Sequence, residues 1–151
     1  MRAAWKQYLR TNPMSCIIDP SNNSTGGLYL GSVDAAKDLQ LLKRYKIGAV
    51  LTVAGRAGIN YDKNDKLRHE IIKADDVPSF DLMNSFGRVF DFLESNLKQT
   101  NVLVHCMAGV SRSATAVIAY LIKTYNWTLQ KALIYCRTKR KVTNPNPGFI
   151  Q

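Results

Sequence analysis

Residues 101–113, with the sequence NVLVHCMAGVSRS, combine a buried strand, a tight loop and the start of a helix. The apolar, β-branched run Asn101–His105 predicts the strand, and the segment from Ser113 predicts the helix. In such a loop, successive backbone N–H groups can point into one hollow. Gly109 permits backbone angles that a side chain would resist, and Arg112 adds a planar fork of donors. The loop is therefore predicted to bind a tetrahedral dianion such as phosphate. The amides predicted to line it belong to Met107, Ala108, Gly109, Val110, Ser111 and Arg112.

Cys106 lies at the base of this loop and is the candidate nucleophile. The thiolate is the reactive form of cysteine, and helix N-termini and nearby cations favour it. Attack on phosphorus in line with the leaving group would give a covalent phosphocysteine, while Arg112 and the amides hold the equatorial oxygens. Ser113 is expected to hydrogen-bond the sulfur and help it leave in the second step. His105 is expected to fix the loop and tune the thiolate through its ring nitrogens.

A general acid is also required, because a serine alkoxide or a tyrosine phenoxide is a poor leaving group at neutral pH. The same group should later activate water. Asp75 and Asp76 are adjacent carboxylates in a predicted loop before a long helix, in a chain with only eleven acidic residues. The spacing to Cys106 alone allows either carboxylate to fill this role.

The remaining chain predicts strands that alternate with helices. Such alternation is typical of an α/β domain with a central, mostly parallel sheet flanked by helices. Residues 1–25 are interpreted as a loosely attached N-terminal lead that contains one helical turn around residues 5–9. Strands are expected at residues 28–31, 47–53, 66–73 and 101–105, and helices at residues 34–45, 81–97, 113–125 and 128–139.

Length, composition and charge narrow the class of protein. The 151 residues suit one domain, and 46% hydrophobic residues exclude a disordered chain. No run approaches the roughly 18 apolar residues of a membrane span. Three widely spaced cysteines suit neither a disulfide framework nor a zinc site, which favours a cytoplasmic or nuclear protein. The net charge is +10, and residues 95–151 hold eight basic and no acidic side chains. This part should attract phosphate dianions.

HCMAGVSRS resembles the His-Cys-x5-Arg-Ser signature of the dual-specificity phosphatases, a branch of the protein tyrosine phosphatase superfamily. The resemblance implies a single phosphotyrosine-phosphatase-like catalytic domain over residues 26–151, with its last helix cut short. It also implies hydrolysis of both phosphotyrosine and phosphoserine/threonine in proteins, with Asp76 as the general acid and Asp75 as its rival. Asn146 would pack beside the active-site loop. Further matching segments are LYLGS at 28–32, VLTVA at 50–54, the run from Asp76 through Asp81 and Leu82 to Phe86, and NPNPGF at 144–149.

Other interpretations stay open beside this one. The basic C-terminal part also suits a phosphoinositide or RNA 5′-phosphatase, although the loop itself contains no lysine. A catalytically dead module that binds phosphoproteins is an alternative of another class, although Cys106, Arg112 and the acids are all present. No cofactor, metal, nucleic acid or membrane span is expected, and phosphorylated proteins are the expected partners.

His69 is interpreted as structural. The cluster Arg137, Lys139, Arg140 and Lys141 is interpreted as a solvated face, or else as a site that recruits an acidic or doubly phosphorylated partner.

Overall fold

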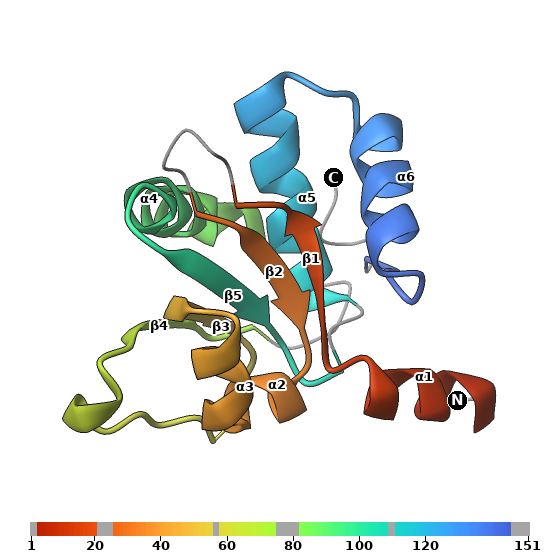
Figure 1. Ribbon diagram of the computed structural model, residues 1–151. Coiled ribbons are helices and arrows are strands. Elements are labelled where there is room, and N and C mark those ends of the chain that lie inside the picture. Colours follow the sequence, from red (N-terminus) through yellow and green to blue (C-terminus); the bar gives the residue numbers. More distant parts are fainter. Residues whose placement is uncertain (1–2, 21–25, 56–57, 75–81, 109–110, 146–151) are drawn as a thin grey trace.

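A five-stranded sheet forms the centre of the protein. Figure 1 shows the computed structural model, with helices on both sides of this sheet. The structure describes residues 3–20, 26–55, 58–74, 82–108 and 111–145. The strand order is β1-β2-β5-β3-β4; β1 runs antiparallel to β2, and the other pairs are parallel. The strands are β1 (Met14–Ile18), β2 (Leu28–Gly31), β3 (Ile47–Val53), β4 (Arg68–Ile72) and β5 (Asn101–His105). The helices are α1 (Ala3–Thr11), α2 (Val33–Lys37), α3 (Leu39–Arg44), α4 (Phe86–Leu97), α5 (Arg112–Tyr125) and α6 (Leu129–Lys139), with short 3-10 turns η1 (Lys63–Asp65) and η2 (Leu82–Ser85).

The central strand β5 is apolar on both faces because helices cover both sides of the sheet. In Figure 1, α4, α5 and α6 lie on one side, and α2 and α3 lie on the other. Val102 and Val104 face the first layer, whereas Leu103 faces the second. The predicted α/β fold with a mostly parallel sheet is therefore confirmed.

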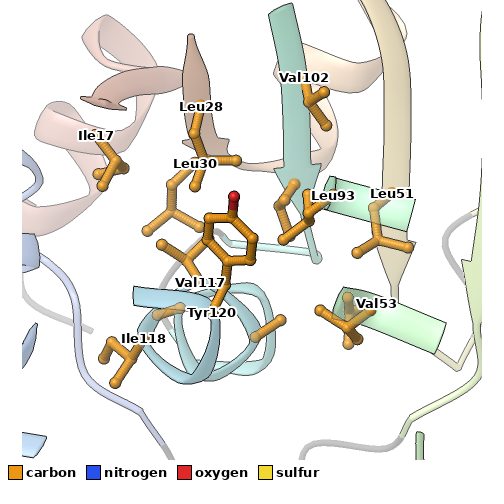
Figure 2. Close-up of a cluster of buried hydrophobic side chains, with 14 of the residues drawn as sticks. Ile17, Leu28, Leu30, Leu51, Val53, Leu93, Val102, Val117, Ile118 and Tyr120 are labelled. Atoms are coloured by element: carbon orange, nitrogen blue, oxygen red, sulfur yellow. The ribbon is translucent and has the colours of Figure 1, made fainter. Parts of the chain in front are cut away.

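The larger core lies between the sheet and α5 (Figure 2). Val117 and Tyr120 of α5 reach toward Leu28 and Leu30 of β2 in this view. Burial of one such aliphatic side chain contributes about 1.5–3 kcal/mol. Because α5 is buried over most of its surface, its first turn is held firmly at the end of β5.

The N-terminal segment differs from the prediction. Residues 3–11 form α1, and residues 14–18 form the edge strand β1, which pairs with β2 from Met14 opposite Gly31 to Ile18 opposite Leu28. The Tyr135 hydroxyl of α6 also donates to the Ile17 carbonyl at 2.7 Å. The expectation of a loose lead was therefore wrong for this part. The short strand MSCII shows no clean alternation of apolar and polar residues, so its pairing was not visible in its pattern.

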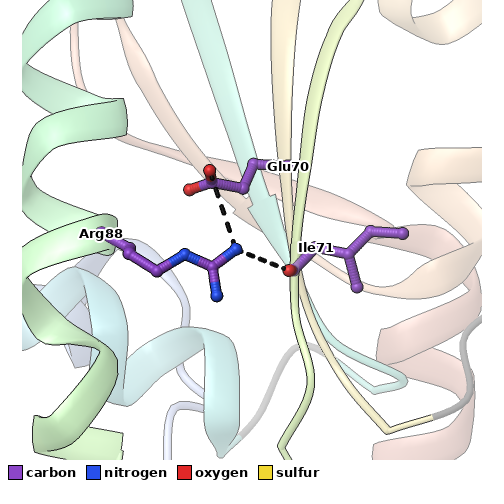
Figure 3. A network of polar contacts seen from close by, with 3 residues as sticks. All are labelled: Glu70, Ile71 and Arg88. Atoms are coloured by element: carbon purple, nitrogen blue, oxygen red, sulfur yellow. Dashed lines mark hydrogen bonds and ion pairs between the residues drawn. The ribbon is translucent and has the colours of Figure 1, made fainter.

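Two helices also differ from their predicted bounds. The helix expected at 34–45 is divided into α2 and α3, because Asp38 ends the first and caps the second by accepting from the Leu41 amide at 3.1 Å. The helix expected from residue 81 becomes α-helical only at Phe86, after η2. Arg88 on this helix lies 3.7 Å from the Glu70 carboxylate and donates to the Ile71 carbonyl at 3.2 Å (Figure 3). These contacts link α4 to the edge strand β4.

The other predicted elements agree closely with the structure. The strands 28–31, 47–53 and 101–105 have the predicted bounds, and the strand expected at 66–73 is β4. The cap predicted for α6 is present, because the Thr128 hydroxyl accepts from the Lys131 amide at 3.1 Å. Over the described part of the chain, no helix has the length and apolar character needed to cross a bilayer.

Candidate active site

Cys106 lies at the carboxyl end of the central strand, where ligands of parallel sheets usually bind. It directly follows His105, which pairs with Gly31 of β2 on one side and Thr52 of β3 on the other. The cysteine is only 2% exposed, and α5 begins six residues later at Arg112. The backbone of the sheet therefore fixes the start of the loop, and the buried helix fixes its end.

The backbone carbonyls of Cys106, Met107 and Ala108 each contact a hydrogen-bonding group that lies outside the loop. The donors come from three different elements, and this fixes which way the peptide groups point. In a trans peptide, the carbonyl and the following amide point in opposite directions, so the amides of Met107 and Ala108 point away from these donors. These are the two amides that the sequence predicts to line the phosphate-binding hollow. The contacts are His105 Nδ1 with the Cys106 carbonyl (3.1 Å), the Val33 amide with the Met107 carbonyl (2.9 Å), and Arg140 Nη2 with the Ala108 carbonyl (3.4 Å).

Ser113 lies beside the sulfur of Cys106. Its Oγ is 3.0 Å from Sγ, and the side chain is completely buried in the first turn of α5. Either atom can donate when the cysteine is a thiol. When the sulfur is a thiolate, only the hydroxyl can donate, so this contact would stabilise the charged form.

Arg112 has a side-chain donor that no described residue satisfies. Its Nη1 donates to the Ala74 carbonyl at 2.8 Å, which fixes the plane of the guanidinium. Its Nε is buried and has no hydrogen-bond partner among the described residues. A buried donor left unmatched costs about 1–3 kcal/mol, so this N–H is a natural place for a phosphate oxygen.

The remaining predicted site residues lie outside the described residues. These are Asp75, Asp76, Gly109, Val110 and Asn146. The described chain does reach Ala74, whose carbonyl is bound by Arg112. The residue that precedes the two candidate acids is thus in direct contact with the expected phosphate-binding arginine.

His105 forms part of a buried polar network. Its Nε2 is 2.7 Å from the Thr52 hydroxyl, which is also 2.7 Å from Nε2 of His69 on β4. Burial lowers the pKa of His105 to about 4, the hydrogen bond to the Cys106 carbonyl opposes this shift, and His69 adds to it. Burial also lowers the pKa of His69. Both rings are therefore neutral at physiological pH.

Arg140 corrects the prediction of a fully solvated basic cluster. Arg137, Lys139 and Lys141 are exposed, but Arg140 is 0% exposed. Besides the Ala108 carbonyl, its guanidinium contacts the Asn12 carbonyl (2.9 Å) and the Ser15 hydroxyl (3.1 Å). Burial lowers the pKa of Arg140, and Tyr8 and Cys106 oppose this shift.

The other two cysteines are chemically distinct from this site. Burial raises the pKa of Cys136 to about 12, and burial followed by Asp19 raises the pKa of Cys16 to about 11. No disulfide joins the three cysteines. Among the described residues, no cluster of three or more histidine, cysteine or acidic side chains is arranged to hold a metal ion.

The family model of the dual specificity phosphatase catalytic domain matches residues 28–151. The chain belongs to this family. Dual specificity protein phosphatase 1 of Arabidopsis thaliana is 40% identical over 83% of the chain and 63% of its own length. Dual specificity protein phosphatase 19 of Mus musculus is 39% identical over 82% of the chain and 56% of its own length. The chain thus spans about three fifths of the length of these relatives.

Solved structures with related sequences share the fold. The structure of DUSP15 superposes with a TM-score of 0.76 at 31% identity and covers 83% of the chain and 80% of its own. A human tyrosine phosphatase-like serine/threonine/tyrosine-interacting protein superposes with a TM-score of 0.79 at 27% identity, covering 91% and 90%. The resemblance identified from HCMAGVSRS is therefore confirmed at the level of family and fold.

Sequence reasoning missed two residues that contact this site. Arg140 was grouped with neighbouring cations, although its place after α6 brings it back to the loop. Thr52 was seen only as part of an apolar strand, although it is 1% exposed and bonded to both histidines. A polar residue inside the run IGAVLTV was the available signal, because a buried hydroxyl requires a partner.

Proposed function

We propose that the protein is a phosphatase that hydrolyses phosphotyrosine and phosphoserine/threonine in proteins through a phosphocysteine intermediate. The observation that carries this proposal is the position of Cys106 Sγ, 3.0 Å from the Ser113 hydroxyl at the start of a helix whose first residue, Arg112, has an unmatched buried Nε. A nucleophile, a donor to its thiolate and a donor for phosphate oxygen thus occur together. Membership of the family supports the same reaction.

In the first step, the Cys106 thiolate attacks phosphorus and the bond to the ester oxygen breaks. The equatorial oxygens accept from Arg112 Nε and from the loop amides. The amides of Met107 and Ala108 need little reorganisation because the carbonyl of the same peptide is already hydrogen-bonded. Asp76 gives its proton to the leaving oxygen, and Asp75 is the alternative donor. The products are the phosphocysteine and the dephosphorylated side chain.

In the second step, water attacks the phosphocysteine and the sulfur leaves. Asp76, now a carboxylate, takes a proton from the water as the new phosphorus–oxygen bond forms. The Ser113 hydroxyl donates to the departing sulfur from 3.0 Å, which stabilises the thiolate as it forms. Inorganic phosphate is released and the enzyme returns to its starting state.

The experiment that tests this proposal measures hydrolysis of p-nitrophenyl phosphate in the presence of EDTA. The wild-type chain should turn over, and Cys106→Ser should lose at least about 1,000-fold in kcat because the hydroxyl is a far weaker nucleophile. Cys16→Ser is the matched control, since this half-buried cysteine lies on β1, and its activity should be unchanged. Full activity in Cys106→Ser would contradict the mechanism.

A second experiment assigns the general acid. Asp76→Asn should slow hydrolysis of a phosphoserine peptide by about 100-fold or more, because its leaving group needs a proton. Asp75→Asn is the matched control and should have a much smaller effect. A larger loss of rate in Asp75→Asn than in Asp76→Asn would assign the general acid to Asp75. Equal rates in both variants and the wild-type chain would exclude both residues as the general acid.

The choice of substrate distinguishes the remaining alternatives. Faster turnover of phosphotyrosine and phosphothreonine peptides than of inositol lipids or 5′-phosphorylated RNA would support the protein phosphatase. The fold also occurs in the human tyrosine phosphatase-like serine/threonine/tyrosine-interacting protein. A module that binds phosphoproteins without hydrolysing them is therefore the competing class of function. Such a binding module would bind phosphopeptides, and the wild-type chain would not hydrolyse them.

The absence of disulfides supports the cytoplasm or nucleus as the location.

A further inference from the structure

We infer that His69 and Thr52 are positioning residues that fix the tautomer of His105 and, through it, the orientation of the first amide of the phosphate loop. The chain has only two histidines, and the hydroxyl of Thr52 lies 2.7 Å from Nε2 of each. These three residues come from three adjacent strands, β4, β3 and β5. This inference extends the proposed function, on which its catalytic consequence rests.

The direction of each hydrogen bond follows from the end of the network at Cys106. A backbone carbonyl can only accept, so Nδ1 of His105, at 3.1 Å, must carry the hydrogen. His105 is completely buried and neutral, so its Nε2 has no hydrogen and must accept. The Thr52 hydroxyl therefore donates to His105. Since a hydroxyl has one hydrogen, its contact with His69 is made by a lone pair, and Nε2 of His69 must donate.

The two histidines thus hold opposite neutral tautomers. His105 carries its hydrogen on Nδ1 and His69 on Nε2, with Thr52 oriented between them. The rings of Tyr61 and His69 pack edge to face with 4.9 Å between their centroids, which helps to keep that imidazole in place. Thr52 is only 1% exposed in its strand, where water cannot easily replace a lost partner of its hydroxyl.

The chemical consequence lies at the peptide between Cys106 and Met107. The carbonyl of this peptide accepts from His105, and its N–H points the opposite way, which under the proposed function is the side of the phosphate. If His105 lost its donor from Thr52, its favoured hydrogen position would no longer be fixed. A ring with the hydrogen on Nε2 would present a lone pair to the Cys106 carbonyl and repel it. The Met107 amide would then be free to turn, which would weaken its contact with the phosphate oxygens in the transition state.

The direct test is NMR of the full chain with 15N-labelled histidine at pH 7.5. We expect one ring with Nδ1–H and Nε2 as acceptor, assigned to His105 by its absence in His105→Asn. The other ring should carry Nε2–H. Finding Nε2–H on His105 in the wild-type chain would overturn the inference. This result does not depend on activity, so it separates a failure of the network from a failure of the proposed phosphatase reaction.

Variants test the positioning role. Thr52→Val keeps the shape of the side chain and removes the hydroxyl, so kcat/KM for p-nitrophenyl phosphate should fall about tenfold and the His105 tautomer signal should change. Thr52→Ser restores the hydroxyl and should restore both readouts. His69→Gln retains an amide donor and should exceed His69→Leu in kcat/KM. Equal activity and unchanged tautomers in Thr52→Val and Thr52→Ser would overturn the role of Thr52, and equal values for the two His69 variants would overturn that of His69.

Discussion

The buried guanidinium of Arg140 donates to the carbonyl of Ala108 across 3.4 Å, which joins the segment after α6 to the proposed phosphate-binding loop. The same side chain binds the Asn12 carbonyl at 2.9 Å and the Ser15 hydroxyl at 3.1 Å. One arginine thus connects the N-terminal segment, the edge strand β1 and the loop after β5. A fully buried cation is retained only when its N–H groups have partners, so these contacts form one unit.

We predict that Arg140→Met weakens both stability and catalysis. The methionine fills similar space but leaves buried acceptors without their donors, which should lower the free energy of unfolding by about 3 kcal/mol. Loss of the contact with Ala108 should also reduce kcat/KM for p-nitrophenyl phosphate about tenfold. Urea denaturation and steady-state kinetics measure the two effects. Lys139→Met is the matched control on an exposed neighbour, and an Arg140→Met protein as stable and active as this control would contradict the role assigned to Arg140.

Removal of the Ser113 hydroxyl should slow the second chemical step more than the first. The hydroxyl is 3.0 Å from the Cys106 sulfur and would donate to the thiolate as it leaves phosphorus. We expect Ser113→Ala to lower kcat about 10- to 100-fold, since a hydrogen bond to a charged group contributes about 1.5–3 kcal/mol. A phosphocysteine should then accumulate, visible as a burst of p-nitrophenol in stopped-flow measurements. Ser95→Ala, on the exposed face of α4, is the control, and a Ser113→Ala enzyme with no burst and unchanged kcat would contradict this role.

Much of the fold could be predicted because its signals are local. The apolar runs of β3 and β5 lie between polar or glycine-containing segments, so their bounds were visible in the sequence. The cap of α6 was equally visible, because Thr128 precedes an amphipathic segment. By contrast, β1 is stabilised mainly by its pairing with β2 and by contacts with α6, which lies far along the chain. Such strands depend on partners that a local pattern does not reveal.

The site shows the same division between local and distant signals. Cys106, Arg112 and Ser113 lie in one short segment, so their spacing predicted their roles. The groups that hold the loop in place come from elsewhere in the chain, as Val33 and Arg140 do. Burial of Arg140 could not be inferred from a sequence in which it stands between two exposed lysines. Only the three-dimensional arrangement shows that one cation of the cluster faces inward.

The three cysteines should differ sharply in their reaction with iodoacetamide. Burial raises the pKa of Cys16 to about 11 and of Cys136 to about 12, so both are almost entirely thiols at pH 7 and should react slowly. We expect a single modification at Cys106 that abolishes activity in parallel. Inorganic phosphate should slow this modification by occupying the loop. Peptide mass spectrometry after timed labelling measures the order, and earlier modification of Cys16, or no protection by phosphate, would contradict the assignment.

Stability should fall as the pH is lowered through the range in which unfolded His105 gains a proton. Burial lowers the pKa of His105 in the folded chain to about 4, whereas an unperturbed histidine titrates near 6.5. Between these values the unfolded state binds more protons, so the free energy of unfolding rises with pH and falls as the solution is acidified. The full contribution of about 3 kcal/mol is present above pH 6.5 and is lost by pH 4.

Urea unfolding of the wild-type chain and His105→Asn at pH 7.5, 6.5, 5.5 and 4.5 measures this effect. The carboxylates act in both proteins, so the difference between the two reports the loss of His105 together with its effect on the neighbouring His69. We expect His105→Asn to be less stable at pH 7.5, because it loses the hydrogen bonds that the imidazole makes with the Thr52 hydroxyl and the Cys106 carbonyl. The two stabilities should converge as the pH falls, because only the wild-type chain loses the contribution of a buried neutral imidazole. Parallel curves across this range would show that His105 titrates alike in the folded and unfolded states, contrary to its burial.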